Sequence, residues 1–451
     1  MPTYERPAAP VAAQWPASAS VPPGSHQAAS ALAWQDFFTD PTLRQLVGTA
    51  LAHNRDLRVA LLNIEQAKAQ LGVRRADQLP TLNAALNGSR TPNSSGGITS
   101  AYTGGLTVTA YEIDFFGRVA SLKEQALAQY LASSEAAQTA RISLMATVAQ
   151  SWLSLLADEE LLAASRQTLS SREESLKLTE LKLQHGAASE LDHRLAQTLL
   201  ESARVTLAQQ TRQRALDENA LTLLLGEPLG EASRAQLGQG RLSQQTFAEL
   251  PAGLPSDLLT RRPDIRQAEQ NLIASNANIG AARAAFFPRI SLTAGAGSAS
   301  NALSGLFKDG SWGWTLAPQL VLPIFDAGRN QSNLDSAKAA RDIAVAQYEK
   351  SIQNAFREVS DALASRSTLA QQLQAQQALL EAETKRNKLT QLRLDHGAAS
   401  QLDGLDAQRS LFTAQQALVQ TRLAYLQNQI ALFKTLGGGG YLPQHEFSMT
   451  N

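Results

Sequence analysis

The chain of 451 residues contains no cysteine, which excludes disulfides, thiolate nucleophiles and zinc sites with cysteine ligands. Aromatic residues make up only 6% of it, and no run approaches the ~18 consecutive apolar residues of a membrane-spanning helix. An excess of one charge is also missing, because 40 basic residues balance 40 acidic ones, so we expect no DNA or RNA partner. If this chain crosses a membrane, it must do so with strands.

The start of the sequence has no apolar signal segment, because Met1 is followed directly by Pro, Ala and Ser. Two explanations are open: a cytosolic location, or a mature sequence from which an export signal has been removed. Alanine, leucine and glutamine are abundant, which favours long, closely approaching helices over a compact mixed core.

The sequence is a tandem duplication. Residues 178–226 return without a gap as residues 389–437, and both copies centre on His-Gly-Ala-Ala-Ser-x-Leu-Asp, at 185–192 and 396–403. The glycine supplies the left-handed residue that ends a helix, and the Ser with the Asp three residues later predicts a capping box that starts the next. Each copy is therefore predicted to be a helical hairpin with a very short tip.

The duplication organises the whole chain. We expect an extended N-terminal arm (1–40), a first repeat (41–226) with a β-hairpin at 80–113 and a tip at 185–190, an equatorial linker (227–256), a second repeat (257–437) with a β-hairpin at 288–322 and a tip at 396–401, and a C-terminal tail (438–451).

Within each repeat, helical and strand patterns alternate. A helix is predicted from Pro41 to about Ala76, with Asp40 as its cap. Period-two patterns predict four strands of about ten residues, the length of a tilted membrane strand, at 80–90, 102–113, 288–298 and 312–322.

Two uninterrupted runs predict helices of roughly 100 Å, because neither 117–185 nor 328–396 has a proline or an interior glycine. Apolar residues in each run have the spacing of a coiled-coil seam: Leu144, Val148, Trp152 and Leu155 in the first, and Ile352, Phe356, Val359 and Leu363 in the second.

Four amphipathic strands cannot close on themselves, because the smallest membrane barrels have about eight. An open sheet would leave unpaired edges in lipid, which is prohibitive. Several chains are therefore expected to share one barrel.

The sequence resembles the TolC-type outer-membrane factors of efflux pumps, in particular the OprM-like, NodT-type lipoprotein branch. The resemblance covers essentially the whole chain, and its most specific motifs are YEIDFFGR at 111–118, TRRPDI at 260–265, IGAARAAFFPRISLT at 279–293, PIFDAGR at 323–329, FREVSDAL at 356–363, LDAQRSLFTAQ at 405–415 and LGGG at 436–439.

The resemblance implies an α+β membrane protein. Such proteins are homotrimers with a twelve-stranded outer-membrane barrel, four strands from each chain, continuous with a periplasmic helical barrel and a small equatorial domain. They form the exit duct for drugs or other small molecules, docked by a periplasmic adaptor and an inner-membrane pump. They have no catalytic site, cofactor or metal. Members of the branch usually start with a lipid-bearing cysteine, whereas Met1 stands here, so a truncated or replaced lipoprotein start is inferred.

The resemblance also implies a gate at the helical tips, lined by Leu402, Asp406 and Arg409, which match the family pattern LxxLDAQR. Asp406 and Arg409 are three residues apart on one helix, so they share a face and can pair. The alternative is an ordinary solvated ion pair of little energetic consequence.

The tips are expected to contact the adaptor, through His185, Gly186, Ala187, Ala188 and Ser189 in the first copy and His396, Gly397, Ala398, Ala399 and Ser400 in the second. Alternatively, the Gly and Ser residues only shape the turn. The two His residues are too isolated for a metal site.

Tyr102, Tyr111, Trp312 and Trp314 fall near strand ends, as an interfacial aromatic belt requires, although soluble sheets also carry aromatics there. Leu303, Leu306 and Phe307 in the second strand loop are candidates to pack the extracellular mouth.

The competing class is a soluble coiled-coil scaffold, which gives no reason for two duplicated strand hairpins. An enzyme is the third alternative, but no phosphate loop, metal spacing or nucleophile-base pair is found. Within the family, type I secretion and metal efflux are the alternatives to drug efflux; only three methionines are present, with no cluster to support metal transport.

Overall fold

The computed structural model describes residues 3–12, 15, 32–92, 94, 96–238, 241–248, 250 and 261–438. Half of the expected N-terminal arm, the end of the expected linker and nearly all of the expected tail lie outside the described residues. None of the described helices is both long and apolar enough to cross a membrane. The chain divides into two compact units.

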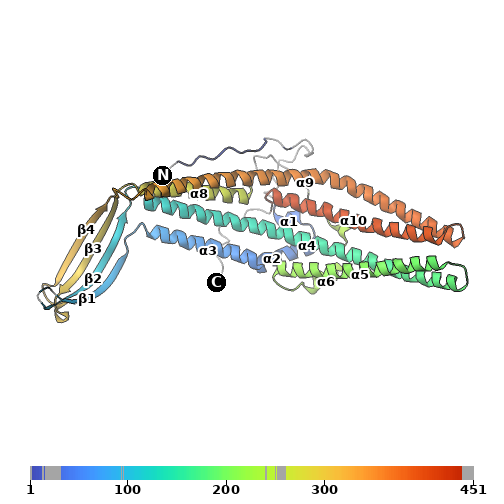
Figure 1. Ribbon diagram of the computed structural model, residues 1–451, viewed down its shortest axis with the longest axis horizontal. Helices are drawn as coiled ribbons and strands as arrows, with labels where there is room; N and C mark the ends of the chain where they lie inside the picture. Colours follow the sequence, from blue (N-terminus) through green and yellow to red (C-terminus); the bar gives the residue numbers. More distant parts are fainter. Residues whose placement is uncertain are drawn as a thin grey trace. The chain divides into compact units, whose positions relative to one another are not determined.

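The first unit, residues 1–10, 61–136 and 264–351, contains a four-stranded antiparallel sheet. Its strands lie side by side in sequence order (Figure 1). The bounds are β1 Leu82–Pro92, β2 Ile98–Ile113, β3 Arg289–Ser300 and β4 Trp312–Val321, within a few residues of the predicted ones. A short turn, η3 (Leu303–Gly305), lies between β3 and β4.

Four helices contribute to the first unit: the later part of α3 (Arg55–Ala76), the first turns of α4 (Arg118–Gln184), nearly all of α8 (Pro263–Ala284) and the first turns of α9 (Arg329–Asp395). Ion pairs hold the described start of the chain on α8. Arg6 donates two hydrogen bonds of 2.7 Å to Glu269, and the Tyr4 hydroxyl donates to the same carboxylate at 2.9 Å. The N-terminal segment is therefore anchored to this unit.

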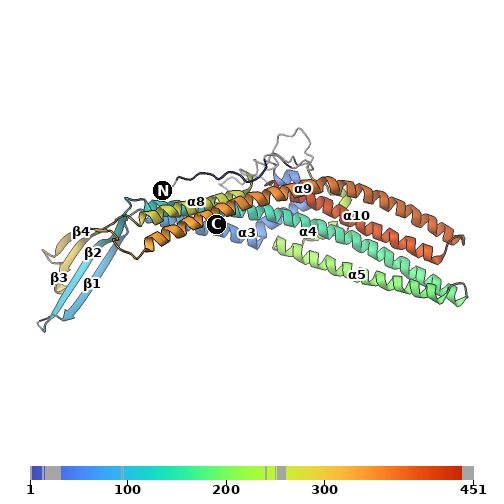
Figure 2. The same ribbon diagram turned by 45° about the horizontal axis from the view of Figure 1, so that its top comes forward.

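The second unit, residues 11–60, 137–263 and 352–451, contains two helical hairpins (Figure 2). One pairs α4 with α5 (Glu190–Leu225), and the other pairs α9 with α10 (Gln401–Thr435). The predicted seam residues lie inside: Val148, Trp152, Leu155 and Val359 are fully or almost fully buried. Phe356 is half-buried and stacks on Trp15, with ring centroids 5.0 Å apart.

An aromatic cluster joins the smaller elements of the second unit to α10. Phe37 of α1 (Trp34–Phe37) stacks on Phe433 with ring centroids 4.2 Å apart and on Phe247 with ring centroids 5.3 Å apart. Between the repeats, α6 (Glu231–Leu237) and η2 (Leu242–Gln244) bury Leu237 and Leu242. These elements occupy the position of the expected equatorial linker.

The helix predicted from Pro41 to about Ala76 is wrong in one respect, because it breaks at Asn54 into α2 (Pro41–His53) and α3. The Asn54 side chain accepts a hydrogen bond from the Leu57 amide and donates one to the Leu224 carbonyl, both at 2.9 Å. It therefore caps α3 while tying the break to the end of α5. A Cβ at Gly226, where φ is +74°, would overlap the His53 carbonyl oxygen.

The second repeat has the corresponding junction. Arg262, just before α8, donates to the Thr435 carbonyl of α10 at 3.1 Å and to Glu358 at 2.8 Å. Gly437, with φ of +72°, lies against the Arg261 carbonyl as Gly226 lies against that of His53. Both repeats thus begin a helix, α3 or α8, beside the end of the last helix of a hairpin, α5 or α10. The side chain that links the two helices differs, being Asn54 in the first repeat and Arg262 in the second.

One buried acid in the second unit has an unusual environment. Asp158 on α4 is only 6% exposed, and its neighbours include Asp217 of α5, Glu159 and Arg214. Burial raises the pKa of Asp158 to about 7, and a hydrogen bond with Asp217 adds to the effect. The folded state therefore holds a proton between about pH 4 and 7 that the unfolded chain releases.

This environment predicts a pH-dependent stability. Since the folded state binds more protons, stability falls as pH rises from about 4 to 7 and is then constant. Asp158→Asn should remove this loss, which amounts to a few kcal/mol of unfolding free energy, on the order of 1.4 kcal/mol for each pKa unit. The variant should therefore have a higher melting temperature than the wild type at pH 8 and a similar one at pH 4. Thermal unfolding followed by helical circular dichroism would measure it. Asp361→Asn, at an exposed position, is the control. The same dependence of melting temperature on pH in the wild type and both variants would contradict the prediction.

Candidate functional site

The sheet has one apolar and one polar face. Because side chains alternate along a strand, the observed register groups them by face. Facing one way are Leu82, Leu86, Leu106, Val108, Leu292, Trp312, Trp314, Leu316 and Leu320; facing the other are Asn83, Asn87, Thr103, Thr107, Ser291, Thr293, Thr315 and Gln319.

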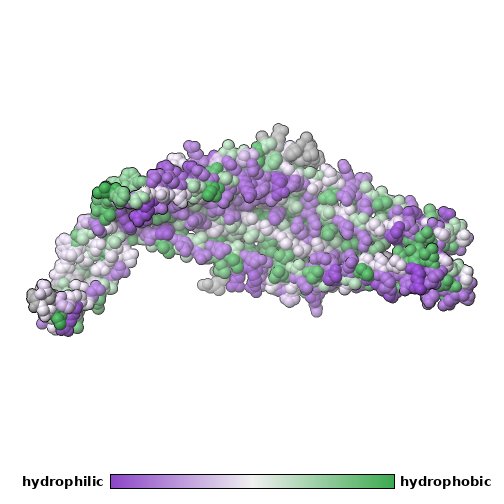
Figure 3. Space-filling view, in the orientation of Figure 1, coloured by the Kyte–Doolittle hydropathy of each residue, from purple (hydrophilic) through white to green (hydrophobic). Residues whose placement is uncertain are grey.

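Most of the large side chains on the apolar face are exposed in the single chain, including Leu82, Leu86, Trp312, Trp314 and Leu320. In the view of Figure 3, the strands carry mostly pale residues, whereas hydrophilic purple residues dominate over the helices. An exposed apolar sheet face of this extent requires an apolar environment or partner.

A β-bulge keeps the end of β2 in this pattern. The pairing of β2 with β3 shifts between Val108 and Tyr111, and Ala110 has φ of +51° there. The extra residue returns Tyr111 to the apolar face, opposite Leu292.

The four aromatic residues expected to form a belt all lie on the apolar face. Tyr102 and Trp312 lie toward the loops, opposite Ser300 and Ser298, with Trp314 one step further in. Tyr111 lies toward the opposite end, where its hydroxyl donates to the Gln78 carbonyl at 3.0 Å. Of the three apolar loop residues, only Leu306 is buried; Leu303 and Phe307 are exposed, so packing at this loop is confined to one of them within the chain.

The seam between β2 and β3, where the two repeats meet, is lined by glycine. A Cβ at Gly105 would overlap the Ala296 carbonyl oxygen, and one at Gly297 would overlap that of Gly104. A shallow hollow of about 310 Å³ lies over these residues and includes Thr103, Thr107 and Thr315. The polar face therefore lacks side chains at Gly105 and Gly297 along this seam, with threonines around them.

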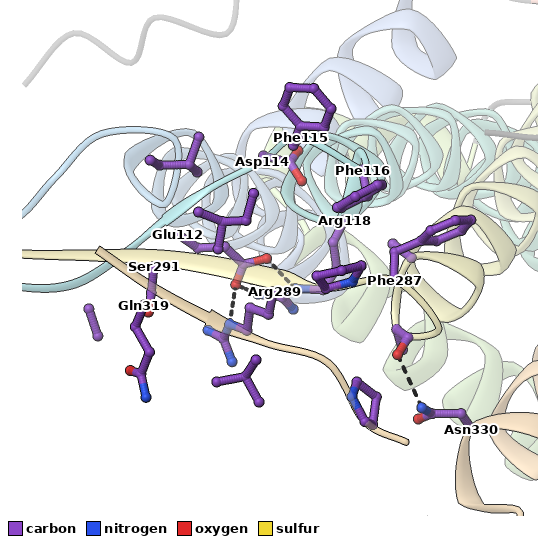
Figure 4. A pocket seen from close by; sticks show the side chains of 18 of the residues that line it. Glu112, Asp114, Phe115, Phe116, Arg118, Phe287, Arg289, Ser291, Gln319 and Asn330 are labelled. Carbon is purple, nitrogen blue, oxygen red and sulfur yellow. Dashed lines mark hydrogen bonds and ion pairs between the residues drawn. The ribbon is translucent and has the colours of Figure 1, made fainter. Parts of the chain in front are cut away.

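A pocket of about 580 Å³ lies where the strands meet the helices (Figure 4). Glu112 accepts two hydrogen bonds of 2.7 Å from Arg118 and is 2.7 Å from the Nε of Arg289. Beside it, Phe116 stacks on Phe287 with centroids 4.9 Å apart. One carboxylate thus joins β2, the start of α4 and the start of β3.

The two tips have the predicted geometry. Ser189 and Asp192 form a complete capping box at the start of α5, and Ser400 and Asp403 form the same box at α10. Gly186 and Gly397 have φ of +70° and +71°. The serine hydrogen bonds lower the pKa of Asp192 and Asp403, because they stabilise the charged carboxylates.

The tip surface extends beyond the predicted residues. His185, Ala187, His396 and Ala398 are exposed, whereas Ala188 and Ala399 are half-buried. Exposed leucines in the adjacent turns occupy matching positions in both repeats: Leu178, Leu181 and Leu191, and Leu389, Leu392 and Leu402. Sequence reasoning had singled out only Leu402, as a gate residue, and missed the other five. Their recurrence in the duplication was the available signal.

The expected gate residues lie together on α10, and their ion pair has an additional member. Asp406 accepts a hydrogen bond of 2.6 Å from Arg409 and one of 3.2 Å from Arg386 of α9. Arg386 also lies 3.1 Å from Glu383. The sequence did not single out Arg386, although an antiparallel hairpin brings together residues equally far from its tip. Leu402, one helical turn before Asp406, is exposed.

The two hairpins are linked close to this cluster. Arg172 of α4 is buried and donates to the Gln408 side chain at 2.9 Å. Desolvation lowers the pKa of Arg172, and the charge of Arg409 adds to the shift. A movement of α10 that repositions Asp406 must therefore alter this link as well.

Comparison with known proteins places these features in a family. The family model described as "Outer membrane efflux protein" matches residues 46–227 and 254–438, one segment for each repeat. The chain belongs to the outer membrane efflux protein family. The expected α+β channel fold, outer-membrane location and efflux role are thereby confirmed at the family level.

Close relatives extend over nearly the entire chain. The toluene efflux pump outer membrane protein TtgC and the antibiotic efflux pump outer membrane protein ArpC, both from Pseudomonas putida, are each 48% identical over 450 residues, 98% of this chain and 92% of the relative. The open state of the MtrE outer membrane channel of Neisseria gonorrhoeae is 40% identical, with a TM-score of 0.89 over 97% of this chain and 98% of that one.

The ion cluster at Glu112 predicts a cost for removing its charge. Glu112→Gln leaves two arginines facing a neutral amide, so we expect a loss of about 1–2 kcal/mol, seen as a lower melting temperature. Glu190→Gln is the matched control, because its partner Arg194 and Glu190 itself are both exposed and such pairs contribute little. Equal melting temperatures for the two variants would refute a structural role for Glu112.

Proposed function

We propose that three copies of this chain form a passive exit duct through the outer membrane for small organic molecules. An inner-membrane pump supplies the energy, and a periplasmic adaptor docks at the helical tips. The duct itself catalyses no reaction and needs no cofactor. The observation that carries this proposal is the exposed apolar face on a sheet whose opposite face is polar.

That sheet suits a membrane wall. Ten residues of β4 extend roughly 33 Å, and a tilt of about 40° gives a height near the ~25 Å apolar band of outer-membrane barrels. Tyr102, Trp312 and Trp314 would lie at one interface and Tyr111 at the other, with outer-membrane lipid as the partner of the face between them. The polar face, with Asn87, Thr107 and Gln319, would line the water-filled interior.

The need for several chains follows from the edges of the sheet. β1 and β4 are the edge strands in the order β1-β2-β3-β4, and unpaired backbone groups in lipid cost several kcal/mol each. Closure needs at least about eight strands, and three chains supply twelve. A barrel of twelve strands also leaves an interior that side chains do not fill.

Contact with an adaptor is supported by the tip surface. Six matching leucines are exposed in the turns next to the tips, beside His185, Ala187, His396 and Ala398. The short turns place two helix ends close together in each repeat, so every chain presents two similar apolar surfaces. A partner with two related apolar binding surfaces fits this arrangement.

A gate at Asp406 is supported by its environment. Three Asp406 side chains close to a common axis repel one another unless each is paired, and both Arg386 and Arg409 are within hydrogen-bonding distance. These pairs are exposed enough for each to be weak, about 0.5 kcal/mol. Weak pairs repeated in three copies suit a closed state that small helix shifts can open.

The names of the relatives favour small organic cargo over proteins or metal ions, because they mention toluene and antibiotics. The three methionines of the chain also give no cluster of soft metal ligands. We therefore favour drug or solvent efflux over type I secretion and metal efflux.

The mass of the protein in detergent and its single-channel current, both measured on one preparation, test the proposed duct. In detergent the purified protein should have the mass of three chains, and in a planar bilayer it should give small, mostly closed single-channel currents. A monomer that stays in solution without detergent would overturn both the trimer and the membrane wall.

The gate gives a separate test. Arg386→Ala should raise the mean single-channel current about tenfold, because three lost pairs of about 0.5 kcal/mol shift the closed-to-open equilibrium by roughly that factor. Asp406→Ala removes the pairs with both Arg386 and Arg409 in each copy and should raise the current at least as much. Lys385→Ala is the matched control, since Lys385 lies beside Arg386 but pairs with Glu381 at an exposed position. Currents like those of the wild type in both test variants would rule out this gate.

A further inference from the structure

The edge strands of the sheet indicate which partner pairs with them. β1 and β4 each have a neighbour on only one side among the described residues, and their apolar side chains are exposed. Ile324, just after β4, is 94% exposed and Leu82, at the start of β1, is 64% exposed. In the proposed trimer, which this inference takes as its basis, each β4 lies beside the β1 of the next copy.

The pairing of β2 with β3 inside the chain is a model for the pairing of β4 with β1 between copies. The pairing of β2 with β3 joins the end of the first strand hairpin to the start of the second. The pairing of β4 with the β1 of another copy joins the end of the second hairpin to the start of the first. Because the hairpins are duplicates, the two junctions are equivalent in sequence.

Two landmarks align the duplicates. Pro80 precedes β1 as Pro288 precedes β3, and the Gly-Arg pair that follows β2 at 117–118 recurs after β4 at 328–329. By these landmarks Ile113 corresponds to Ile324, and Ile290 corresponds to Leu82. Since Ile113 lies opposite Ile290, Ile324 should lie opposite Leu82 of the next copy.

We infer that β4 and the segment after it pair antiparallel with β1 of a second copy of this chain in one specific register. In this register Ile324, Leu322 and Leu320 lie opposite Leu82, Ala84 and Leu86 of the next copy. The directions agree, because an even number of alternating strands in each chain keeps every neighbour antiparallel around the ring.

The chemistry of the two edges supports this register. Near the helices it sets Leu320 beside Leu86 and Leu322 beside Ala84, and on the other face it sets Gln319 beside Asn87 and Thr315 beside Thr91. Toward the loops it sets Leu316 beside Arg90. A slip by one residue would turn every side chain of one strand to the wrong face and set leucine beside asparagine. The β2 bulge is not copied, because β4 pairs with β3 without a shift, so regular steps of two continue along β4.

The strand-to-helix junction gives an independent comparison. Within the chain, Phe116 after β2 stacks on Phe287, which precedes β3. The residue that corresponds to Phe287 is Leu79, which is 69% exposed and precedes β1. The residue that corresponds to Phe116 is Ala327, so the aromatic stack itself is not repeated. Ile324 and Phe325 after β4 are almost fully exposed in the single chain, and Leu79 of the next copy is available to cover them.

Disulfide trapping tests the register cleanly, because the chain has no cysteine of its own. Two double variants carry matched pairs, Leu320→Cys with Leu86→Cys on the apolar face and Gln319→Cys with Asn87→Cys on the polar face. Within one chain, β1 and β4 are three strand steps, roughly 14 Å, apart, beyond the ~7 Å Cα separation that a disulfide spans. A disulfide can therefore form only between copies.

The controls shift each pair by four residues, about 13 Å along the strand: Leu320→Cys with Leu82→Cys, and Gln319→Cys with Asn83→Cys. After mild oxidation, a matched variant should run on a non-reducing gel as linked dimers and trimers that reduction separates, with at least tenfold less product in its shifted control. Stronger linkage in the shifted variants would overturn the register.

The mass in detergent distinguishes a failure of the strand register from a failure of the trimeric duct itself. A wild-type trimer whose matched variants are also trimeric but never link would overturn the register and leave the duct in place. A wild-type protein that is monomeric in detergent would overturn both. Single-cysteine variants establish that linkage requires both members of a pair.

Discussion

The backbone hydrogen bond of an edge strand is the constraint on which this structure depends. In water an unpaired amide at the edge of a sheet binds solvent, but in lipid it must find another strand. The apolar face from Leu82 to Leu320 needs an apolar environment, and the same environment forbids the open edges at β1 and β4. Assembly of several chains is then a consequence of where the leucines lie.

The two repeats keep the same backbone arrangement at equivalent places but use different side chains there. The Asn54 and Arg262 junctions use different side chains to reach equivalent carbonyl groups, those of Leu224 and Thr435, while Gly226 and Gly437 both allow close backbone approach. Backbone geometry has therefore been kept where side-chain chemistry has changed. The same logic makes the β2–β3 junction a guide to contacts between copies.

The sequence predicted those features whose cause is local. Glycine and serine at the tips specify a left-handed residue and a capping box, and the period-two runs specify the strands. The family resemblance then supplied Leu402, Asp406 and Arg409, which lie together as expected.

Features that depend on residues distant in the sequence were missed. The break at Asn54 has no proline or glycine to announce it. Its cap on the Leu57 amide is local, but the Leu224 carbonyl that holds the other end of the side chain comes from tertiary packing. Arg386 and Arg289 each join a carboxylate on another element, and Asp158 is an ordinary helical residue until α5 covers it. Patterns along the chain do not record which side chains meet across helices and strands.

The glycine seam between β2 and β3 has a consequence for cargo. At Gly105 and Gly297 the polar face presents peptide groups that carry no side chain of their own, whereas Thr107 and Thr315 lie beside Gly295. The peptide groups of paired strands are already hydrogen-bonded to one another and offer the same surface to any solute. Three such strips would run along the inside of the assembled wall. A surface of this kind binds no particular molecule, which suits an exit duct whose cargo is selected by the pump.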